Sequence, residues 1–342
     1  MKPRYLRFAT VLALSLTFAL PAAQAGAVRL PPPQLDNAAS GIAGGALFGG
    51  TSPLLAEQGA LGRKLAIVRL YYMIGQKFTT PKVDQIMSGG GTVLASLDIP
   101  HGHGITYASV TAGRQDTQIR AWLTEAEQEA VAHNISAVYV SFEHEANTTA
   151  NHVLGTPAQF QAAWNHIHSL AAQAHLNAAN GGRLRWAMIL MHTAYFPANM
   201  RPRWSYRLGF ASQYFPGAGS VDVIAADGYN RGGCRSRNAS KPTQATVTPG
   251  SLFDPVLTFA RTHGGLPVFI AEWGSAFYPG APGWQATFIP LMQAYVLANP
   301  SIAAVLYWDQ RGNFACHFAV NGHPQSVAAL TTMGKVINGH LG

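Results

Sequence analysis

Eight short apolar runs recur along this chain, and the segments between them carry helical patterns. Strands that alternate with helices favour a parallel sheet covered by helices, and eight such strands are the number that closes a barrel. We therefore expect an α/β fold in which residues 26–342 form a single (β/α)8 barrel, also called a TIM barrel. The runs are 46–50, 65–71, 92–97, 137–142, 184–191, 221–226, 267–271 and 303–308.

The segments between the runs have recognisable helix starts. Thr156-Pro157-Ala158-Gln159 is a capping box with proline at the first helical position, and further helices are expected from Asp116 and Gly283. A doubly wound open sheet is the main competing fold. No Gly-x-Gly-x-x-Gly follows the first run, so we do not expect a dinucleotide site. We expect no cofactor.

The N-terminus has the pattern of a secretory signal peptide. Three basic residues precede the apolar stretch 8–20, and a small-x-small cleavage pattern follows at Ala23-Gln24-Ala25. The stretch is too short for a spanning helix, which needs about 20 apolar residues. We expect a signal peptide over 1–25 and a mature protein that is secreted, to the outside or the periplasm, with no attachment to a membrane.

The charge of the mature chain argues against nucleic acid as a partner. Removing 1–25 lowers the formal net charge from +8 to +5, and the basic residues are scattered rather than gathered in long runs. We expect a monomer. The two cysteines, Cys234 and Cys316, favour a disulfide in an exported chain, although they follow different strands.

The acidic residues are few and unevenly placed. Of the 15 Asp and Glu, six follow or end the expected strands: Asp98, Glu143, Glu145, Asp227, Glu272 and Asp309. Carboxyl groups at the mouth of a barrel suit glycoside hydrolysis, which needs an acid and a second carboxylate about 5 to 5.5 Å apart if the second is a nucleophile. Glu145 and Glu272 are the best candidates for this pair.

Strand alternation places Glu143 and Glu145 on one face, with Glu145 nearer the mouth. Glu145 is then the candidate acid. We expect Glu143 to form a buried ion pair, with Arg69 of the second strand as its candidate partner.

These motifs resemble glycoside hydrolase family 26, of the retaining clan A with a (β/α)8 barrel and β-mannanase-type members. The resemblance is carried by five short motifs in the family's order: Phe142-Glu143-His144-Glu145-Ala146-Asn147, Ala163-Trp164 with Ile167-His168, Asp227-Gly228-Tyr229, Ile270-Ala271-Glu272-Trp273-Gly274 and Tyr307-Trp308-Asp309.

The resemblance implies roles for individual residues. Glu145 would be the acid/base and Glu272 the nucleophile; Tyr229 would hydrogen-bond the nucleophile, and Trp308 would stack on sugar. His144 would contact the sugar or the region of the nucleophile. Core packing stays open for Trp308 and Trp273. The substrate-binding set that we expect is His144, Asn147, Tyr229, Trp308, Asp98, His101, His103, Arg69, Trp273 and Asp227.

The chain also departs from that family. Thr148-Thr149-Ala150 stands where the family continues with glycine and tryptophans, and Ser141 stands where an arginine is often found. The substrate is therefore open. We expect a retaining endo-β-glycanase acting on a polysaccharide, with β-1,4-mannan as first choice; xylan, mixed-linkage β-glucan and a microbial surface glycan are alternatives, as is a barrel that binds carbohydrate without catalysis.

Two further patterns have competing interpretations. His101-Gly102-His103 near Asp98 suggests a metal, with His144 and His192 as further ligands, but two histidines fall short of the three or four ligands needed. We favour sugar contacts and expect no metal. The aromatic cluster Tyr195, Phe196, Trp204 and Tyr206 fits sugar subsites and a packed loop equally well.

Overall fold

Eight parallel strands close into a barrel in the computed structural model of this protein, which describes residues 46–200, 209–234, 239–310 and 316–337. Each strand pairs with the next in the sequence, and β1 pairs with β8. The expected (β/α)8 barrel is confirmed and the open sheet is excluded. The strands are β1 Leu47–Thr51, β2 Ile67–Met73, β3 Thr92–Asp98, β4 Val138–Phe142, β5 Leu184–Met191, β6 Val223–Asn230, β7 Val268–Ser275 and β8 Ile302–Tyr307.

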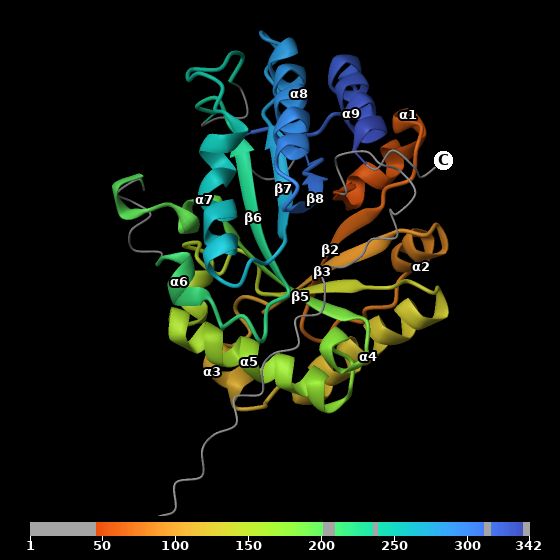
Figure 1. Ribbon diagram of the computed structural model, residues 1–342, viewed down its shortest axis with the longest axis vertical. Coiled ribbons are helices and arrows are strands. Elements are labelled where there is room, and N and C mark those ends of the chain that lie inside the picture. The colour runs from red at the N-terminus through yellow and green to blue at the C-terminus, as the bar shows by residue number, and fades with distance from the viewer. Residues whose placement is uncertain (1–45, 201–208, 235–238, 311–315, 338–342) are drawn as a thin grey trace, which may run out of the picture. The chain divides into compact units, whose positions relative to one another are not determined.

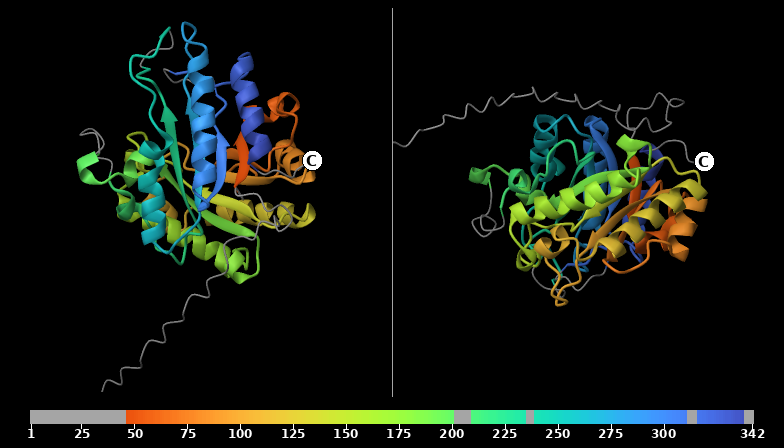
Figure 2. Two further views of the ribbon diagram at one scale, coloured as in Figure 1. Left: turned by 45° about the horizontal axis from the view of Figure 1, so that its top comes forward. Right: turned by 90° about the horizontal axis from the view of Figure 1, so that it is seen from below.

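The α-helices surround the strands, as the views in Figures 1 and 2 show. Within the described residues they are α1 Gln58–Leu61, α2 Pro81–Ser88, α3 Tyr107–Thr111, α4 Asp116–Ala132, α5 Pro157–Gln173, α6 Ala211–Tyr214, α7 Pro249–Thr262, α8 Gly283–Ala298 and α9 Pro324–Val336. Short 3-10 helices add η1 Ser52–Glu57, η2 Asn151–Leu154, η3 Ala178–Asn180, η4 His192–Tyr195 and η5 Ala198–Met200.

Helix α5 begins where the capping box predicts. The Thr156 hydroxyl accepts from the backbone N–H of Gln159, and the Gln159 side chain accepts from the N–H of Thr156. Its apolar stripe, which includes Phe160 and Trp164, is buried against the strands. The helices expected from Asp116 and Gly283 are α4 and α8.

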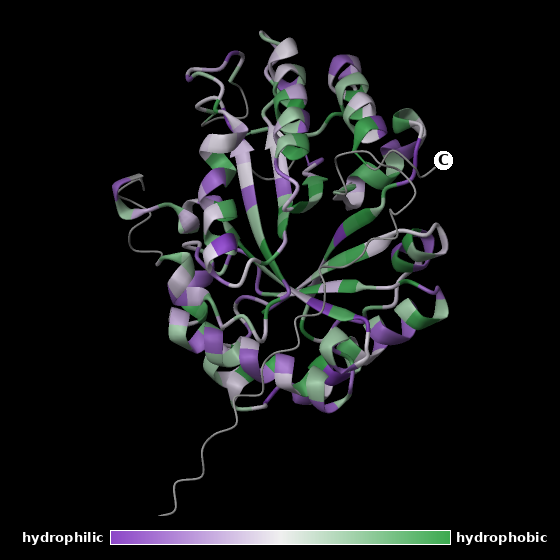
Figure 3. Cartoon of the chain, in the orientation of Figure 1, coloured by the Kyte–Doolittle hydropathy of each residue, from purple (hydrophilic) through white to green (hydrophobic). Residues whose placement is uncertain are grey.

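The barrel interior and the layer between strands and helices form separate cores. Inward-facing residues such as Ile67, Leu94, Tyr139 and Phe269 make the inner cluster. The opposite faces of the strands pack against the helices, and Figure 3 shows apolar residues on the strands beside mixed colours on the helices. Alternation along β2 puts Arg69 on the same face as Ile67, one step nearer the carboxyl end.

A disulfide joins Cys234, in the loop after β6, to Cys316, in the loop after β8, as expected. Phe277, in the loop after β7, pairs with His317, in the loop after β8, in an isolated antiparallel bridge. The expected signal peptide, 1–25, lies outside the described residues. Among the helices that the structure describes, none is long and apolar enough to cross a membrane.

Candidate active site

Glu272 lies on β7 at the mouth of the barrel and is held by three side chains from other strands. Tyr71 of β2 donates a hydrogen bond of 2.5 Å to Oε1, and Tyr229 of β6 donates to Oε2. The Arg69 guanidinium lies 2.8 Å from Oε1. Glu272 as a whole residue is 3% exposed, so neighbouring side chains fix the orientation of its carboxylate more than water does.

Arg69 is fully buried and joins two acids. Its Nη1 lies 2.8 Å from Asp227 Oδ1 as well as 2.8 Å from Glu272 Oε1. The expected pair between Arg69 and Glu143 is therefore wrong, because Asp227 and Glu272 already occupy the guanidinium. Both Arg69 and Asp227 are 0% exposed, so they position Glu272 rather than contact a sugar.

An irregularity in the pairing of β6 and β7 sets the positions of Asp227 and Glu272. The register between these strands shifts at Ala226/Asp227, so that Ile270 pairs with Ala226 but Glu272 pairs with Asp227. An extra residue in one strand bends it and re-aims the side chains beside it. This irregularity places Asp227 and Glu272 side by side at the mouth.

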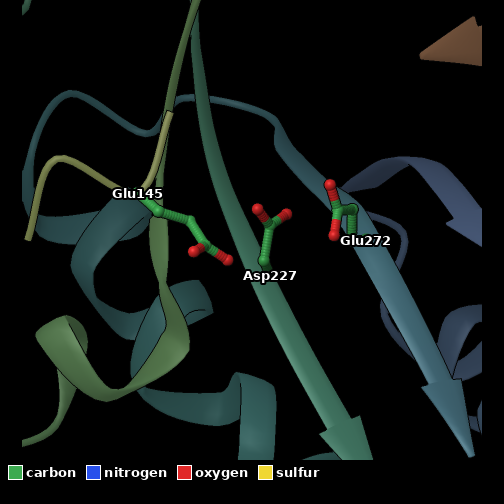
Figure 4. A group of neighbouring side chains, drawn as sticks. All are labelled: Glu145, Asp227 and Glu272. Carbon is green, nitrogen blue, oxygen red and sulfur yellow. The ribbon is translucent and has the colours of Figure 1, made fainter. Parts of the chain in front are cut away.

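Glu145 completes a group of three carboxyl groups, in which Asp227 lies between the two glutamates (Figure 4). One carboxyl oxygen from each of Glu145, Asp227 and Glu272 lies within 4.8 Å of the others. Burial, and next the charge of Glu272, raise the pKa of Glu145, although His144, Arg69 and Arg231 oppose the shift. The raised pKa keeps this carboxyl group protonated to higher pH than an ordinary glutamate.

Asp227 also favours its protonated form. Burial raises its pKa well above the usual value, and the carboxylates of Glu272 and Glu145 add to this effect, which Arg69 only partly offsets. One buried guanidinium thus faces three carboxyl groups. The pKa values of Asp227 and Glu145 are both raised, while Glu272 accepts hydrogen bonds from Tyr71 and Tyr229.

The chain after β4 does not continue as a strand, which corrects the expected alternation of Glu143 and Glu145. The strand ends at Phe142, and both glutamates have left-handed backbone, with φ of 49° and 53°. Glu143 N–H bonds to Leu97 O on β3, whereas Glu145 N–H bonds to Ile189 O on β5, at 3.0 Å each. Their side chains diverge.

The carboxylate of Glu143 accepts a 2.7 Å bond from the Ile99 backbone. Burial, and then the charge of Asp98, raise its pKa to about 8. Such left-handed non-glycine residues cluster at functional sites, where the surroundings hold them in place. Glu143 therefore shapes the bend that presents Glu145 and takes no part in the carboxyl group of three.

His144 forms an ion pair with Asp98, the last residue of β3. Its Nδ1 lies 3.0 Å from the carboxylate. Burial alone would lower the pKa of His144, but the charge and hydrogen bond of Asp98 outweigh it and raise the pKa to about 9. The imidazole ring is 5.4 Å from that of Tyr71 and its side chain stays 26% exposed, so it can reach a sugar beside Glu145.

Of the other residues predicted to bind substrate, Trp273 and Asn147 are buried. Trp273 is 0% exposed and packs against Phe288 and Tyr307, so it is a core residue and not a sugar-binding one. Asn147 is 1% exposed, and its Oδ1 accepts from the Met191 backbone, so it anchors the loop instead of binding sugar.

Trp308 is different, because it is only partly buried and meets the Tyr71 ring edge-on at 5.9 Å. It remains available as a stacking platform. Of the aromatic cluster, Tyr195 is buried with its hydroxyl bonded to Ala225 O, which agrees with a packed loop. Trp204 and Tyr206 lie outside the described residues.

The histidines of the β3 loop do not gather into a metal site in the described part of the chain. His101 and His103 are exposed, and His101 Nε2 lies 3.2 Å from Asn151 Oδ1. His192 instead bonds Asp227 O at 3.0 Å, and burial lowers its pKa to about 4, so it is neutral. Across the described residues, Glu145, Asp227 and Glu272 are the one group of three with metal-ligand spacing, and Arg69 forms ion pairs with two of them, Asp227 and Glu272.

Tyr71 is the functional residue that the sequence did not single out. It follows Arg69 by two positions on β2 and therefore shares its inward face. That spacing beside a buried arginine is the signal that could have identified it.

Comparison with known proteins gives the fold. No protein-family model and no curated protein matches the sequence. A family 26 β-mannanase from Bacteroides ovatus matches with a TM-score of 0.55 and 14% identity, over 85% of this chain and 88% of its own. A protein described as GH26C from a Muricauda species matches with a TM-score of 0.54 and 10% identity, over 87% and 86%.

A family 128 endo-β-1,3-glucanase from Sorangium cellulosum matches with a TM-score of 0.51 and 15% identity, over 84% of this chain and 98% of its own. At such identities the likeness shows the fold alone. The chain therefore shares the (β/α)8 barrel of solved glycoside hydrolases, families 26 and 128 among them.

Proposed function

We propose that this protein is a secreted, retaining endo-β-glycanase, with Glu145 as acid/base and Glu272 as nucleophile. The observation that carries the proposal is the approach of their carboxyl oxygens to within 4.8 Å. Retaining glycosidases place the two carboxyl groups about 5 to 5.5 Å apart, whereas inverting enzymes need about 6.5 to 9.5 Å to admit a water between them.

The surroundings of the two glutamates suit a double displacement. Glu145 would donate its proton to the leaving glycosidic oxygen while Glu272 Oε attacks the anomeric carbon and forms a covalent glycosyl-enzyme. The ester has no negative charge, so the Coulombic contribution of Glu272 to the raised pKa of Glu145 disappears. Glu145 then becomes the base that takes a proton from the attacking water, and the freed Glu272 regains its bonds from Tyr71 and Tyr229.

β-1,4-Mannan remains the first substrate to test, because the motifs resemble family 26 and one structural neighbour is a β-mannanase. Xylan, mixed-linkage β-glucan and microbial surface glycans follow. The partly buried Trp308 supports a polymeric substrate by offering a ring at the mouth of the site. The disulfide between Cys234 and Cys316 supports export to an oxidising compartment.

The test is release of reducing ends from mannan, glucomannan, xylan and mixed-linkage glucan, with chelator present throughout. We expect Glu145→Gln and Glu272→Gln each to lower kcat by at least about 10³-fold on whichever polymer is cleaved. Glu57→Gln, a partly exposed acid on η1, serves as the matched control and should retain full activity.

The anomeric configuration of the first product, followed by NMR, checks the stereochemistry. Retention is expected, since the spacing leaves no room for a water between the carboxyl groups. Inversion, or activity that survives Glu272→Gln, would remove Glu272 from the nucleophile role. Binding to a polymer without hydrolysis would favour the carbohydrate-binding barrel instead.

A further inference from the structure

In the described parts of the loops that follow β2 to β8, the exposed charged residues Lys77, Arg231 and Lys241 are all basic. Seven segments join β2 to β8 with the next α-helix, and their described residues include three basic ones, Lys77, Arg231 and Lys241, and three acids, Glu143, Glu145 and Asp309. The connection after β1, Ser52–Glu57, adds the partly exposed Glu57. Glu143 and Asp309 are 2% and 3% exposed, and Glu145 belongs to the carboxyl group of three. The segments are 74–80, 99–106, 143–156, 192–210, 231–248, 276–282 and 308–323.

No exposed carboxylate outside the proposed catalytic pair is therefore found in the described parts of these loops. The three basic residues Lys77, Arg231 and Lys241 are all exposed. The other acids of the described chain lie on helices, on strands or before β6. Carboxylates accept hydrogen bonds from the hydroxyl groups of neutral sugars, so exposed acids are compatible with a site that binds a neutral glycan. Their absence from these described loops is better suited to a negatively charged glycan.

Arg231 is the exposed loop cation that lies beside the candidate catalytic residues. It directly follows β6, and its guanidinium carbon lies 5.5 Å from the centre of the Tyr229 ring, whose hydroxyl holds Glu272. Its charge also acts on the Glu145 carboxyl group. Among the described residues no carboxylate forms an ion pair with Arg231.

The backbone of Arg231 is fixed in place. Its carbonyl oxygen accepts from the Tyr278 hydroxyl at 2.5 Å and from the Cys234 N–H at 3.0 Å. Cys234 is bonded to Cys316, and left-handed Gly232 and Gly233 form the turn between. A guanidinium on a fixed backbone, with an aromatic face beneath it, is preorganised for a planar anion.

We propose that the substrate is an anionic glycan, with a carboxylate on a sugar near the cleaved bond, and that Arg231 binds this carboxylate. A glycan carboxylate close to Glu145 and Glu272 would be repelled without a fixed cation, and Arg231 supplies one. Guanidinium binds carboxylate through paired N–H donors, which gives orientation as well as attraction. The inference rests on the proposed glycanase function and specifies its substrate class.

The test compares polymers that differ only in charge. One pair is β-1,4-linked polymannuronate and its carboxyl-reduced form, which is a β-1,4-mannan. The other is glucuronoxylan and its carboxyl-reduced form. Hydrolysis is measured as kcat/KM for the wild type, and binding is measured by affinity electrophoresis of Glu272→Gln in gels that contain each polymer.

We expect the anionic member of at least one pair to be preferred by about tenfold, the scale of a hydrogen-bonded charge pair. Arg231→Gln should reduce that ratio to near one, and Arg231→Lys should restore part of it. Lys335→Gln removes an exposed charge at the end of α9 and should leave the ratio unchanged. Raising salt to about 0.5 M should weaken the preference.

Hydrolysis or binding of only the uncharged members would overturn the inference and leave the glycanase function standing. Binding of an anionic polymer through Arg231 without hydrolysis would support the anionic site while the proposed catalysis fails. A preference for the anionic member that persists in Arg231→Gln would also contradict the assignment of Arg231.

Discussion

At the scale of residues, the orientation of Glu272 depends on two tyrosines. Burial raises the pKa of Tyr71 and of Tyr229 well above the usual value, so both hydroxyls stay protonated and donate to the carboxylate. Each bonds a different oxygen, and Arg69 adds its charge to Oε1. A nucleophile held in this way keeps its position through the formation and breakdown of the covalent intermediate.

We expect Tyr71→Phe and Tyr229→Phe each to lower kcat by about ten- to a hundredfold, because each variant removes one bond to a buried carboxylate. KM should change less, since neither hydroxyl is freely exposed to the substrate. Initial rates on the cleaved polymer provide the measurement. Tyr295→Phe is the control, because it removes a hydrogen bond from a tyrosine of α8 to Asp254 of α7, and it should keep full kcat. An unchanged kcat in Tyr71→Phe would show that Tyr71 does not position Glu272.

At the scale of elements, the bend after β4 determines where the acid/base lies. Two left-handed residues switch the backbone bonds from β3 to β5 within three positions. The His144–Asp98 pair then ties this bend to the end of β3, and the His144 N–H adds a 3.2 Å bond to the same carboxylate. The stability of the bend should therefore depend on the charge of one histidine.

The sign of that dependence follows from the raised pKa of His144, which is about 9 in the folded chain against an ordinary value of 6.5. The stabilisation is fully present below pH 6.5 and is lost as the pH rises through 9. We expect the free energy of unfolding of the wild type, relative to His144→Gln, to fall by about 1 to 2 kcal/mol across that interval, after allowance for partial exposure.

Urea unfolding at a series of pH values measures this difference. In an Asp98→Asn background the substitution of His144 should have no pH-dependent effect, because the partner charge is gone. A difference between wild type and His144→Gln that stays constant from about pH 6 to pH 10 would show that the ion pair does not stabilise the fold.

At the scale of the whole molecule, closure of the barrel assembles the site. Arg69, Asp227 and Glu272 come from β2, β6 and β7, and Glu145 follows β4. The disulfide acts on the same scale, since it closes a loop of 82 residues that includes β7 and Glu272. It joins the loop after β6 to the loop after β8.

Replacing both Cys234 and Cys316 by serine should lower the free energy of unfolding by about 2 to 4 kcal/mol, because the unfolded chain gains the freedom that the crosslink removes. Chemical denaturation of oxidised wild type and of the double variant measures the loss. Thiol titration of the unreduced, denatured wild type should find no free thiol, and two thiols per chain would contradict the disulfide.

The sequence alone was sufficient for the strand count, the alternation with helices, the main helix starts and the concentration of the few acids at strand ends. These features are local: periodicity, capping residues and composition are read within a few positions. The pairing of Arg69 with Asp227 and Glu272, the role of Tyr71 and the burial of Trp273 could not be predicted in that way. They depend on which strands face each other across the barrel and on register.

The bend at Glu143 and Glu145 shows the division most clearly. In the sequence, Glu143 and Glu145 are two positions apart and follow an apolar run, so the alternation of a regular strand would put their side chains on one face. Only the tertiary structure decides otherwise, because backbone bonds to two different neighbouring strands hold both residues in a left-handed conformation that neither prefers alone. The sequence determined which residues can do the chemistry, and the closed barrel determined which of them meet.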